Sequence, residues 1–320
     1  MRTLGIDLET FSDVDIKNAG LYKYAENAEI LLFAYAFDDG PVEVIDFTAG
    51  EEIPVEVLDA FSDKDILKIA YNAPFEMAVL KANGYHIDPC QWLCTMVLAY
   101  TLGLPGGLAD VGRALGMPED KMKMSVGKRL IQYFCKPCKP TKANGGRTRN
   151  YPMDDPEKWE QFIEYNRQDV EAERAIRKKI EFNFPSDRER QLWCLDYYIN
   201  TTGILVDMKL VESAISVDAK IKEEATREAI KLTGIQNPKS VPQMQQWFLE
   251  QEGYIPKTMD KTFRSEYLAS GSNEKVKQFF RLKNLIAKTS VKKYKAMKNM
   301  VCNDGRVHGM LQFYGEQRTG

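Results

Sequence analysis

Apolar runs of strand length alternate with helix signals through the first 85 residues, and this alternation limits the folds open to the chain. Runs bounded by turn residues predict strands. Asn72 followed by Pro74 predicts a helix start, because Asn caps helices and Pro fits their first turn. Strands alternating with helices predict a layered α/β core. The expected strands are 3–8, 30–37, 42–47 and 66–71, and the expected helices are 54–61 and 72–81.

The rest of the chain has a mainly helical pattern, and 320 residues exceed one ordinary domain. A long helix is predicted after Pro156 and ends near residue 181, where the turn residues of segment 183–186 follow. We therefore expect two domains, 1–184 and 185–320, of which the second is mostly α-helical. Further expected elements are a polar, mobile loop at 136–150, helices near 187–200, 208–233, 240–252 and 274–300, and a short strand at 204–206.

The composition, with 44% hydrophobic and 28% charged residues, suits a globular protein and excludes collagen-like or wholly disordered chains. No apolar run approaches the roughly 20 residues that span a bilayer. Asp7 stands where a signal peptide needs an apolar stretch. Six cysteines are too sparse for a disulfide scaffold and fit a reducing compartment. We expect a soluble, cytoplasmic monomer without a membrane segment.

Two stretches carry only positive charge, although the net charge is −2. Residues 121–149 and residues 275–298 each hold nine Lys or Arg and no Asp or Glu. Such local clusters on a nearly neutral protein indicate contacts with a polyanion. The alternative is a solvated surface with accidental clustering.

Carboxylates recur at meaningful spacings in three separate places. Asp7 and Glu9 are two residues apart on the first expected strand, so both side chains leave the same face. Acids on one face repel each other, and hard cations such as Mg²⁺ or Mn²⁺ prefer oxygen ligands of this kind. The pair therefore indicates a metal site, against the alternative of a solvated strand end.

The other two places carry less information when each is taken alone. Glu76 lies in the first turns of the helix that Asn72 opens, where the helix dipole favours a carboxylate on any surface. Tyr165 and Asp169 are four residues apart and share a helix face, which is a common arrangement. Each of these has an ordinary surface alternative.

Taken together, the three places resemble the motifs of the DEDDy 3′→5′ exonucleases: Asp-x-Glu on a strand, Asn-x-x-Phe-Glu opening a helix, and Tyr-x-x-x-Asp on a late helix. The resemblance implies a ribonuclease-H-like fold, a mixed sheet flanked by helices, and a pair of divalent ions, Mg²⁺ or Mn²⁺. It gives Asp7, Glu9 and Asp169 the role of direct metal ligands. It makes Glu76 the outer acid, which acts on the metals partly through water. It gives Tyr165 the role of orienting the attacking water. The second motif usually ends in Asp, so Glu76 is a departure that keeps the charge.

The same resemblance suggests substrate contacts. Thr10 follows the first motif where the family contacts the terminal nucleotide, and Asn72 opens the second motif. In the basic loop, Arg147 and Arg149 are candidates for phosphate contacts. The pair Cys135 and Cys138 has zinc-like spacing, but a lone CxxC is weak evidence for zinc.

The second part of the chain resembles the region that follows the exonuclease domain in family A DNA polymerases of bacteriophages and prophages, where the thumb begins. The resemblance implies that the polymerase active site, palm and fingers lie beyond this chain, so we expect it to be part of a longer enzyme. The segments that carry it are 198–207, 237–240, 259–262, 288–294, 304–309 and 317–320.

These observations predict a proofreading 3′→5′ exodeoxyribonuclease that releases nucleoside monophosphates from single-stranded or frayed 3′ DNA ends. A frayed end needs no duplex melting to enter a narrow cleft. Two alternatives remain open. One is a non-catalytic DNA-binding or structural module of a polymerase, and the other is an RNA-directed exonuclease of the same superfamily.

Overall fold

The computed structural model describes residues 2–118 and 126–316. The chain divides into two compact units, Met1–Leu205 with Met300–Gly320 and Val206–Asn299. Within the described residues, no helix combines the length and the apolar character needed to cross a membrane. The similarity segment 317–320 and the basic residues Lys121 and Lys123 lie outside the described part.

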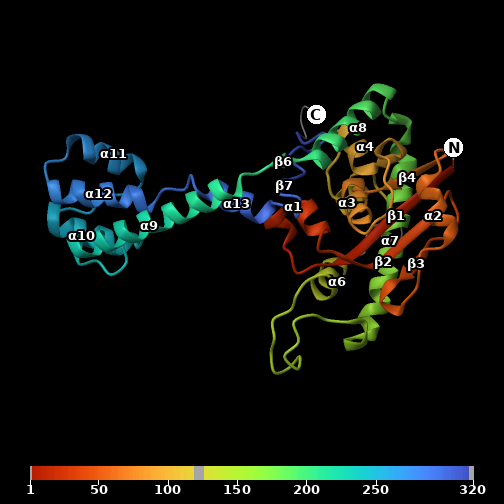
Figure 1. Cartoon of the computed structure of the whole chain (residues 1–320), viewed down its shortest axis with the longest axis horizontal. Coiled ribbons are helices and arrows are strands. Elements are labelled where there is room, and N and C mark those ends of the chain that lie inside the picture. The colour runs from red at the N-terminus through yellow and green to blue at the C-terminus, as the bar shows by residue number, and fades with distance from the viewer. Residues whose placement is uncertain (1, 119–125, 317–320) are drawn as a thin grey trace. The chain divides into compact units, whose positions relative to one another are not determined.

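The first unit is built on a mixed five-stranded sheet with the order β3-β2-β1-β4-β5 (Figure 1). β2 pairs antiparallel with β1 and β3, whereas β4 pairs parallel with β1 and β5. Helices flank this sheet, so the expected α/β, ribonuclease-H-like architecture is confirmed. The strands are β1 (Arg2–Phe11), β2 (Glu29–Phe37), β3 (Glu43–Asp46), β4 (Ile66–Ala70) and β5 (Trp92–Cys94).

The central strand β1 separates two environments. Leu4, Ile6 and Leu8 point into the hydrophobic core that holds Met77 of α3. The alternate residues face α7, where Val170 lies against Gly5. Because side chains alternate along a strand, Asp7 and Glu9 share this α7 face.

Helix α7 packs on β1, β2 and β3, while α2 packs on β4 and α3 contacts β1, β4 and β5. α7 begins at Pro156, where the Asp155 side chain accepts a hydrogen bond from the Lys158 amide. The α-helices of this unit are α1 (Ile16–Ala25), α2 (Val55–Ser62), α3 (Ala73–Ala82), α4 (Thr95–Thr101), α5 (Leu108–Ala114), α6 (Gly127–Phe134), α7 (Pro156–Ile180) and α8 (Asp187–Thr202). Short 3₁₀ turns lie at Phe47–Ala49, Pro89–Gln91, Pro152–Asp154 and Glu181–Asn183.

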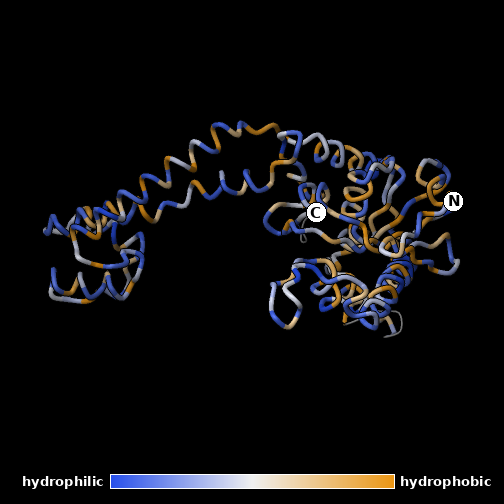
Figure 2. The backbone as a smooth tube through the Cα atoms, turned by 60° about the horizontal axis from the view of Figure 1, so that its bottom comes forward, coloured by the Kyte–Doolittle hydropathy of each residue, from blue (hydrophilic) through white to orange (hydrophobic). Residues whose placement is uncertain are grey.

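The second unit is helical, which confirms the mostly α-helical second part. α9 and α12 pack along each other, and an aromatic core containing Trp247, Phe248 and Phe280 lies beneath them. Hydrophobic and hydrophilic residues alternate along the helical segments (Figure 2). The helices are α9 (Met208–Thr233), α10 (Val241–Glu252), α11 (Lys261–Ser270), α12 (Glu274–Ile286) and α13 (Lys292–Met300).

The compact units do not coincide with the expected domains 1–184 and 185–320. Trp193 and Tyr197 of α8 belong to the core of the first unit. Downstream, β7 (Arg306–Val307) pairs with β6 (Ile204–Leu205), and this returns the chain to the first unit. The division into functional domains stays a prediction.

Several local expectations were wrong or incomplete. The helix expected over 274–300 is two helices, because the chain turns at Thr289, whose carbonyl accepts from the Lys292 amide. Helix α1 was not expected, since Gly20 interrupts it with a left-handed φ of 78°. A disulfide also joins Cys90 to Cys194, whose Cα atoms lie 5.6 Å apart, and the sequence analysis did not predict it.

Candidate active site

Strand β1 and helix α7 bring three acids together from distant parts of the chain. Asp7 and Glu9 project from β1, and Asp169 projects from the facing side of α7. Each offers a carboxylate oxygen, and these oxygens all lie within 4.8 Å of one another. The pairing of β1 with β2 shifts register between Glu9 and Thr10, an irregularity that re-aims side chains at a strand end. The structure therefore gathers the three predicted direct ligands in one place.

Glu76 approaches the same pocket from α3. It is 4% exposed, and its Oε2 atom has no hydrogen-bond partner among the described residues. Burial, followed by the charge of Asp7 and then by that of Glu9, raises the pKa of Glu76 well above its usual 4.5. Glu76 is not one of the three acids whose oxygens lie within 4.8 Å of one another, and its outer place at the metals stays a prediction.

Tyr165 lies on the same face of α7, one turn before Asp169, and its side chain is fully buried. Its ring stacks on Phe162 with a centroid distance of 6.0 Å and an interplanar angle of 8°. Burial, and after it the charges of Glu9 and Asp169, raises the pKa of the Tyr165 hydroxyl far above its usual 10.0. The hydroxyl therefore stays protonated at physiological pH.

Gly127, the first residue of α6, makes room for the Tyr165 ring. A Cβ atom built on Gly127 would lie 2.1 Å from the ring carbon Cε2, far inside van der Waals contact. No side chain larger than a hydrogen atom fits at this position while the ring keeps its place.

The two predicted contacts to the terminal nucleotide also line the pocket. Thr10 is buried, and its Oγ1 shares a 2.7 Å hydrogen bond with the Tyr24 hydroxyl. Asn72 precedes α3, but its side chain makes no capping hydrogen bond. The expectation that the Asn72 side chain caps the helix was therefore wrong. Asn72 nevertheless lines the acidic pocket.

Asn166 is a residue that the sequence analysis missed. It is fully buried next to Tyr165, and its Nδ2 donates to Oδ2 of Asp7 at 2.7 Å and to the Asp7 carbonyl at 3.3 Å. Its spacing of three residues from Asp169 places it on the same helix face, and this signal was available in the sequence. The amide fixes the orientation of the Asp7 carboxylate.

Cys135 contacts a second acid. Its Sγ lies 3.7 Å from Oε2 of Glu9, and burial, followed by the charge of Glu9, raises the pKa of this thiol well above 9.0. Cys138 instead donates to the Arg147 carbonyl. Among the described residues, the two cysteines join no cluster of three or more metal-ligating side chains, so the zinc interpretation gains no support.

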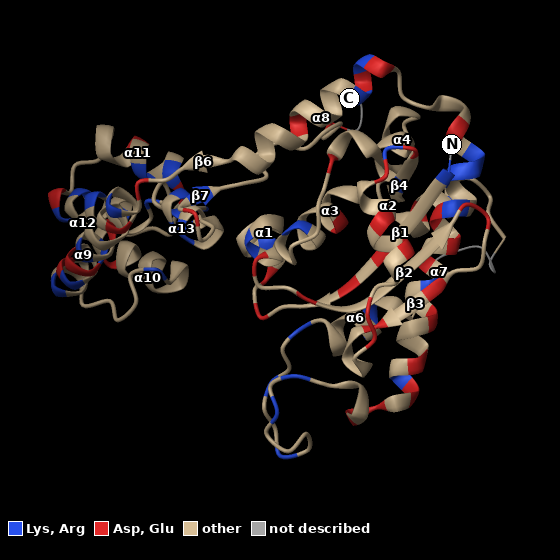
Figure 3. Cartoon of the chain, turned by 45° about the vertical axis from the view of Figure 1, so that its right-hand side comes forward, with Lys and Arg blue, Asp and Glu red and all other residues tan. Residues whose placement is uncertain are grey.

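Arg147 and Arg149 lie away from the acids. Arg149 holds Glu29 with two hydrogen bonds of 2.7 and 2.9 Å, and its guanidinium lies over the Phe11 ring at 3.9 Å. Arg147 forms an ion pair with Asp154 at 3.1 Å. Neither arginine lines the acidic pocket. Figure 3 shows the loop after α6 with Lys and Arg but without Asp or Glu.

The acidic pocket has a volume of about 800 Å³, within the range of small-ligand sites. Its walls come from β1, the segment before α1, α3, the end of α6 and α7. It is large enough for a nucleotide beside the acids.

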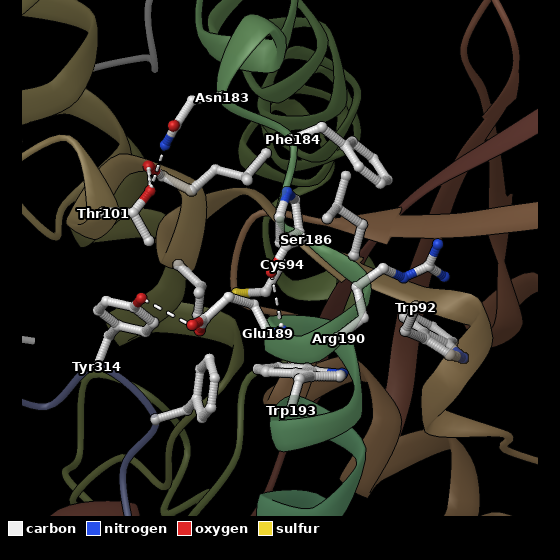
Figure 4. Close-up of a pocket in the computed structure, with 15 residues that line it drawn as sticks. Trp92, Cys94, Thr101, Asn183, Phe184, Ser186, Glu189, Arg190, Trp193 and Tyr314 are labelled. Atoms are coloured by element: carbon white, nitrogen blue, oxygen red, sulfur yellow. Dashed lines mark hydrogen bonds between the residues drawn. The ribbon is translucent and has the colours of Figure 1, made fainter.

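A second cavity of about 180 Å³ lies elsewhere in the first unit, lined mostly by apolar side chains (Figure 4). Trp92, Phe184 and Trp193 form part of its wall. Hydrogen bonds of Tyr314 to Glu189 and of Asn183 to Thr101 cross its rim. None of the predicted site residues lines this cavity.

Comparison with known proteins agrees with the sequence resemblance. No family model matches the chain. The chain is 49% identical over 323 residues to the DNA polymerase of Bacillus phage SP02, and the match covers all of this chain and 49% of that polymerase. The chain thus spans about half the length of this curated relative. Its predicted similarity to a phage DNA polymerase is confirmed.

A solved structure also matches. The POL domain of Pol1 from M. smegmatis, in complex with DNA primer-template and dNTP, has a TM-score of 0.53 and 16% identity, over 96% of this chain and 48% of that chain. At this identity the match shows the fold alone. NrnC of Brucella melitensis matches over 60% of this chain and 78% of its own, with 18% identity and a TM-score of 0.38, which is too low to support an inference.

Proposed function

We propose that this chain is the proofreading 3′→5′ exodeoxyribonuclease module of a family A DNA polymerase and hydrolyses the terminal phosphodiester to release nucleoside monophosphates. The observation that carries the proposal is the meeting of Asp7, Glu9 and Asp169 oxygens within 4.8 Å of one another, beside the buried Glu76. The similarity to a phage DNA polymerase along the whole chain supports a polymerase context.

The residues of the pocket fit divalent metal ions. All the donors are carboxylates, as Mg²⁺ and Mn²⁺ prefer, and the buried Oε2 of Glu76 has no hydrogen-bond partner among the described residues. Asp7, Glu9 and Asp169 would hold two ions directly, and Glu76 would act through water. When bound, such ions activate the attacking water and stabilise the charge on the leaving oxygen.

The other residues of the pocket position the reactants. By the resemblance, the protonated Tyr165 hydroxyl, which also has a side-chain hydrogen bond with Asp169, would orient the attacking water. Asn166 keeps Asp7 in one orientation, so the site does not reorganise during the reaction. Thr10 and Asn72 line the part of the pocket that receives the terminal nucleotide.

The substrate is a single-stranded or frayed 3′ DNA end, because a free end enters the pocket without the cost of melting a duplex. Palm and fingers, by the resemblance, belong to the longer enzyme and would complete it. A monomeric state, a cytoplasmic location and the thumb role of the second unit stay predictions.

A digestion assay tests the proposal. Single-stranded DNA labelled at its 5′ end is incubated with Mg²⁺ or EDTA, with the wild-type chain and with Asp7→Ala. We expect stepwise shortening from the 3′ end with Mg²⁺ only, and none with Asp7→Ala. Failure to digest with both Mg²⁺ and Mn²⁺ supports a non-catalytic module instead, and digestion that survives Asp7→Ala contradicts catalysis by these acids.

A second comparison addresses the substrate. The same oligonucleotide sequence is supplied as DNA and as RNA under single-turnover conditions. We expect faster cleavage of DNA. Equal or faster cleavage of RNA contradicts a proofreading role and favours an RNA-directed exonuclease.

A further inference from the structure

Residues 136–150, here called the basic loop, connect α6 to the segment before α7 and carry five cations without any carboxylate. The cations are Lys136, Lys139, Lys142, Arg147 and Arg149. They fall into two groups with different surroundings.

The basic loop has a defined internal hydrogen-bond network. The Cys138 amide donates to the Thr148 carbonyl at 2.8 Å, and the Gly146 amide donates to the Thr141 carbonyl at 2.9 Å. Asn144 donates from Nδ2 to the carbonyls of Lys139 and Arg147 and ties the two sides together. The loop therefore presents its side chains from a folded backbone, although the sequence had suggested a mobile segment.

The two arginines are occupied in holding the base of the basic loop. Arg149 is bonded to Glu29 of β2 and stacked on Phe11 of β1. Arg147 is paired with Asp154. These carboxylates already neutralise both guanidinium groups, so a phosphate would have to displace them.

The three lysines are in the opposite situation. Lys136, Lys139 and Lys142 are exposed, and none has an ion-pair partner among the described residues. They occur at every third position in the first half of the basic loop. Exposed cations without carboxylate partners are the ordinary contacts of a nucleic-acid backbone.

The basic loop starts at the wall of the acidic pocket. Cys135 contacts Glu9 through its thiol, and its carbonyl accepts from the Ser12 amide. The next residue, Lys136, lines the same pocket as Asp7 and Glu9. Lys139 is four residues from Cys135, which limits the separation of their Cα atoms to about 14 Å. The row of three lysines therefore begins at the wall of the acidic pocket.

We propose that the basic loop binds the backbone of single-stranded DNA on the 5′ side of the nucleotide that occupies the acidic pocket, with Lys136, Lys139 and Lys142 contacting phosphates. Arg147 and Arg149 support the loop and do not contact phosphate. The place of the loop in cleavage rests on the proposed function, whereas the binding itself is measurable without cleavage. The acids repel a polyanion, and the lysines supply the opposing attraction.

The test is a binding titration in the Asp7→Ala background, in which the proposed function expects no cleavage. A fluorescent single-stranded DNA of about 15 nucleotides is titrated in Mg²⁺ buffer over a range of salt concentrations. The test variant changes Lys136, Lys139 and Lys142 to Gln. The matched control changes Lys64, Lys81 and Lys179 to Gln, three exposed lysines on other elements of the first unit. Thermal unfolding verifies that both variants fold.

We expect the test variant to bind on the order of 10- to 100-fold more weakly at 0.1 M salt, and its slope of log affinity against log salt to fall by roughly 2, about 0.7 for each lost phosphate contact. The control should match the parent. Equal affinity and slope in test and control overturn the proposal. The predicted loss of affinity supports it even if the wild-type chain cleaves no DNA, so the two proposals fail separately.

Discussion

The fit of Tyr165 against α6 allows a sharp test of how the ring acts. Replacing Gly127 by Ala places a Cβ atom 2.1 Å from the Tyr165 ring. Non-bonded carbon atoms pack at separations of about 3.5 to 4.0 Å, so the Tyr165 ring or helix α6 must move by about 1.4 Å or more. The ring is fully buried and stacked on Phe162, so it cannot move without disturbing its neighbours.

On the proposed mechanism, a shift of this size displaces the Tyr165 hydroxyl from the attacking water. Misplacement by about 1 Å costs roughly 100-fold in rate. Overpacking of a core costs about 1–3 kcal/mol of stability. We therefore expect Gly127→Ala to fold, to lose about 100-fold in single-turnover cleavage, and to keep the rise in Tm that Mn²⁺ gives, because the acids are untouched.

Two comparisons complete the test. Tyr165→Phe should show a similar loss, and the double variant Gly127→Ala/Tyr165→Phe should be no slower than the worse single variant, because both changes remove one function. Gly5→Ala is the matched control, since its Cβ would meet Val170 at an ordinary 3.5 Å. Cleavage at the wild-type rate by Gly127→Ala would refute the idea that the position of the Tyr165 ring matters.

Three further predictions concern the acids and the residue that orients one of them. Asp7→Asn should raise the Tm of the metal-free protein by relieving repulsion and abolish the rise in Tm with Mn²⁺, as scanning calorimetry can measure. The raised pKa of Glu76 means that, above pH 4.5, the folded metal-free chain keeps a proton that the unfolded chain loses. Its free energy of unfolding should then fall by about 1.4 kcal/mol per pH unit up to the folded-state pKa, and denaturant titrations should show this slope vanish in Glu76→Gln. Asn166→Ala should weaken Mn²⁺ binding roughly 10- to 100-fold in titration calorimetry, and unchanged affinity would contradict its role in orienting Asp7.

Sequence patterns predicted the parts of the fold whose signals are local. Strands β1 to β4 and helix α7 lie close to the expected residues, because the apolar period and the flanking turn residues specify them. The three-residue strand β5 and helix α1 were missed. β5 is too short to show a period, and α1 contains Gly20 in a left-handed conformation that no local pattern announces.

The candidate site was predictable to a different degree. Spacing alone placed Asp7 with Glu9 and Tyr165 with Asp169, but only the family resemblance joined them to Glu76. The pairing of Arg149 with Glu29 joins residues 120 positions apart, and no sequence pattern reports such a contact. This is why Arg149 looked like a free cation in the sequence.

Asp7 and Glu9 lie on β1, the central strand of the sheet, and this placement affects how the site would bind metal. Two ionised carboxylates within 4.8 Å of each other repel by about 3.5 kcal/mol or more at an effective dielectric constant of about 20, so the cluster resists its own assembly. β1 overcomes this because it is paired on both sides, by β2 and β4, and because Leu4, Ile6 and Leu8 anchor its opposite face in the core. Burial of each such side chain stabilises the fold by about 1.5–3 kcal/mol. The alternation of one strand thus supplies both the repelling acids and the apolar residues that hold them, and cations would enter a site that is already formed.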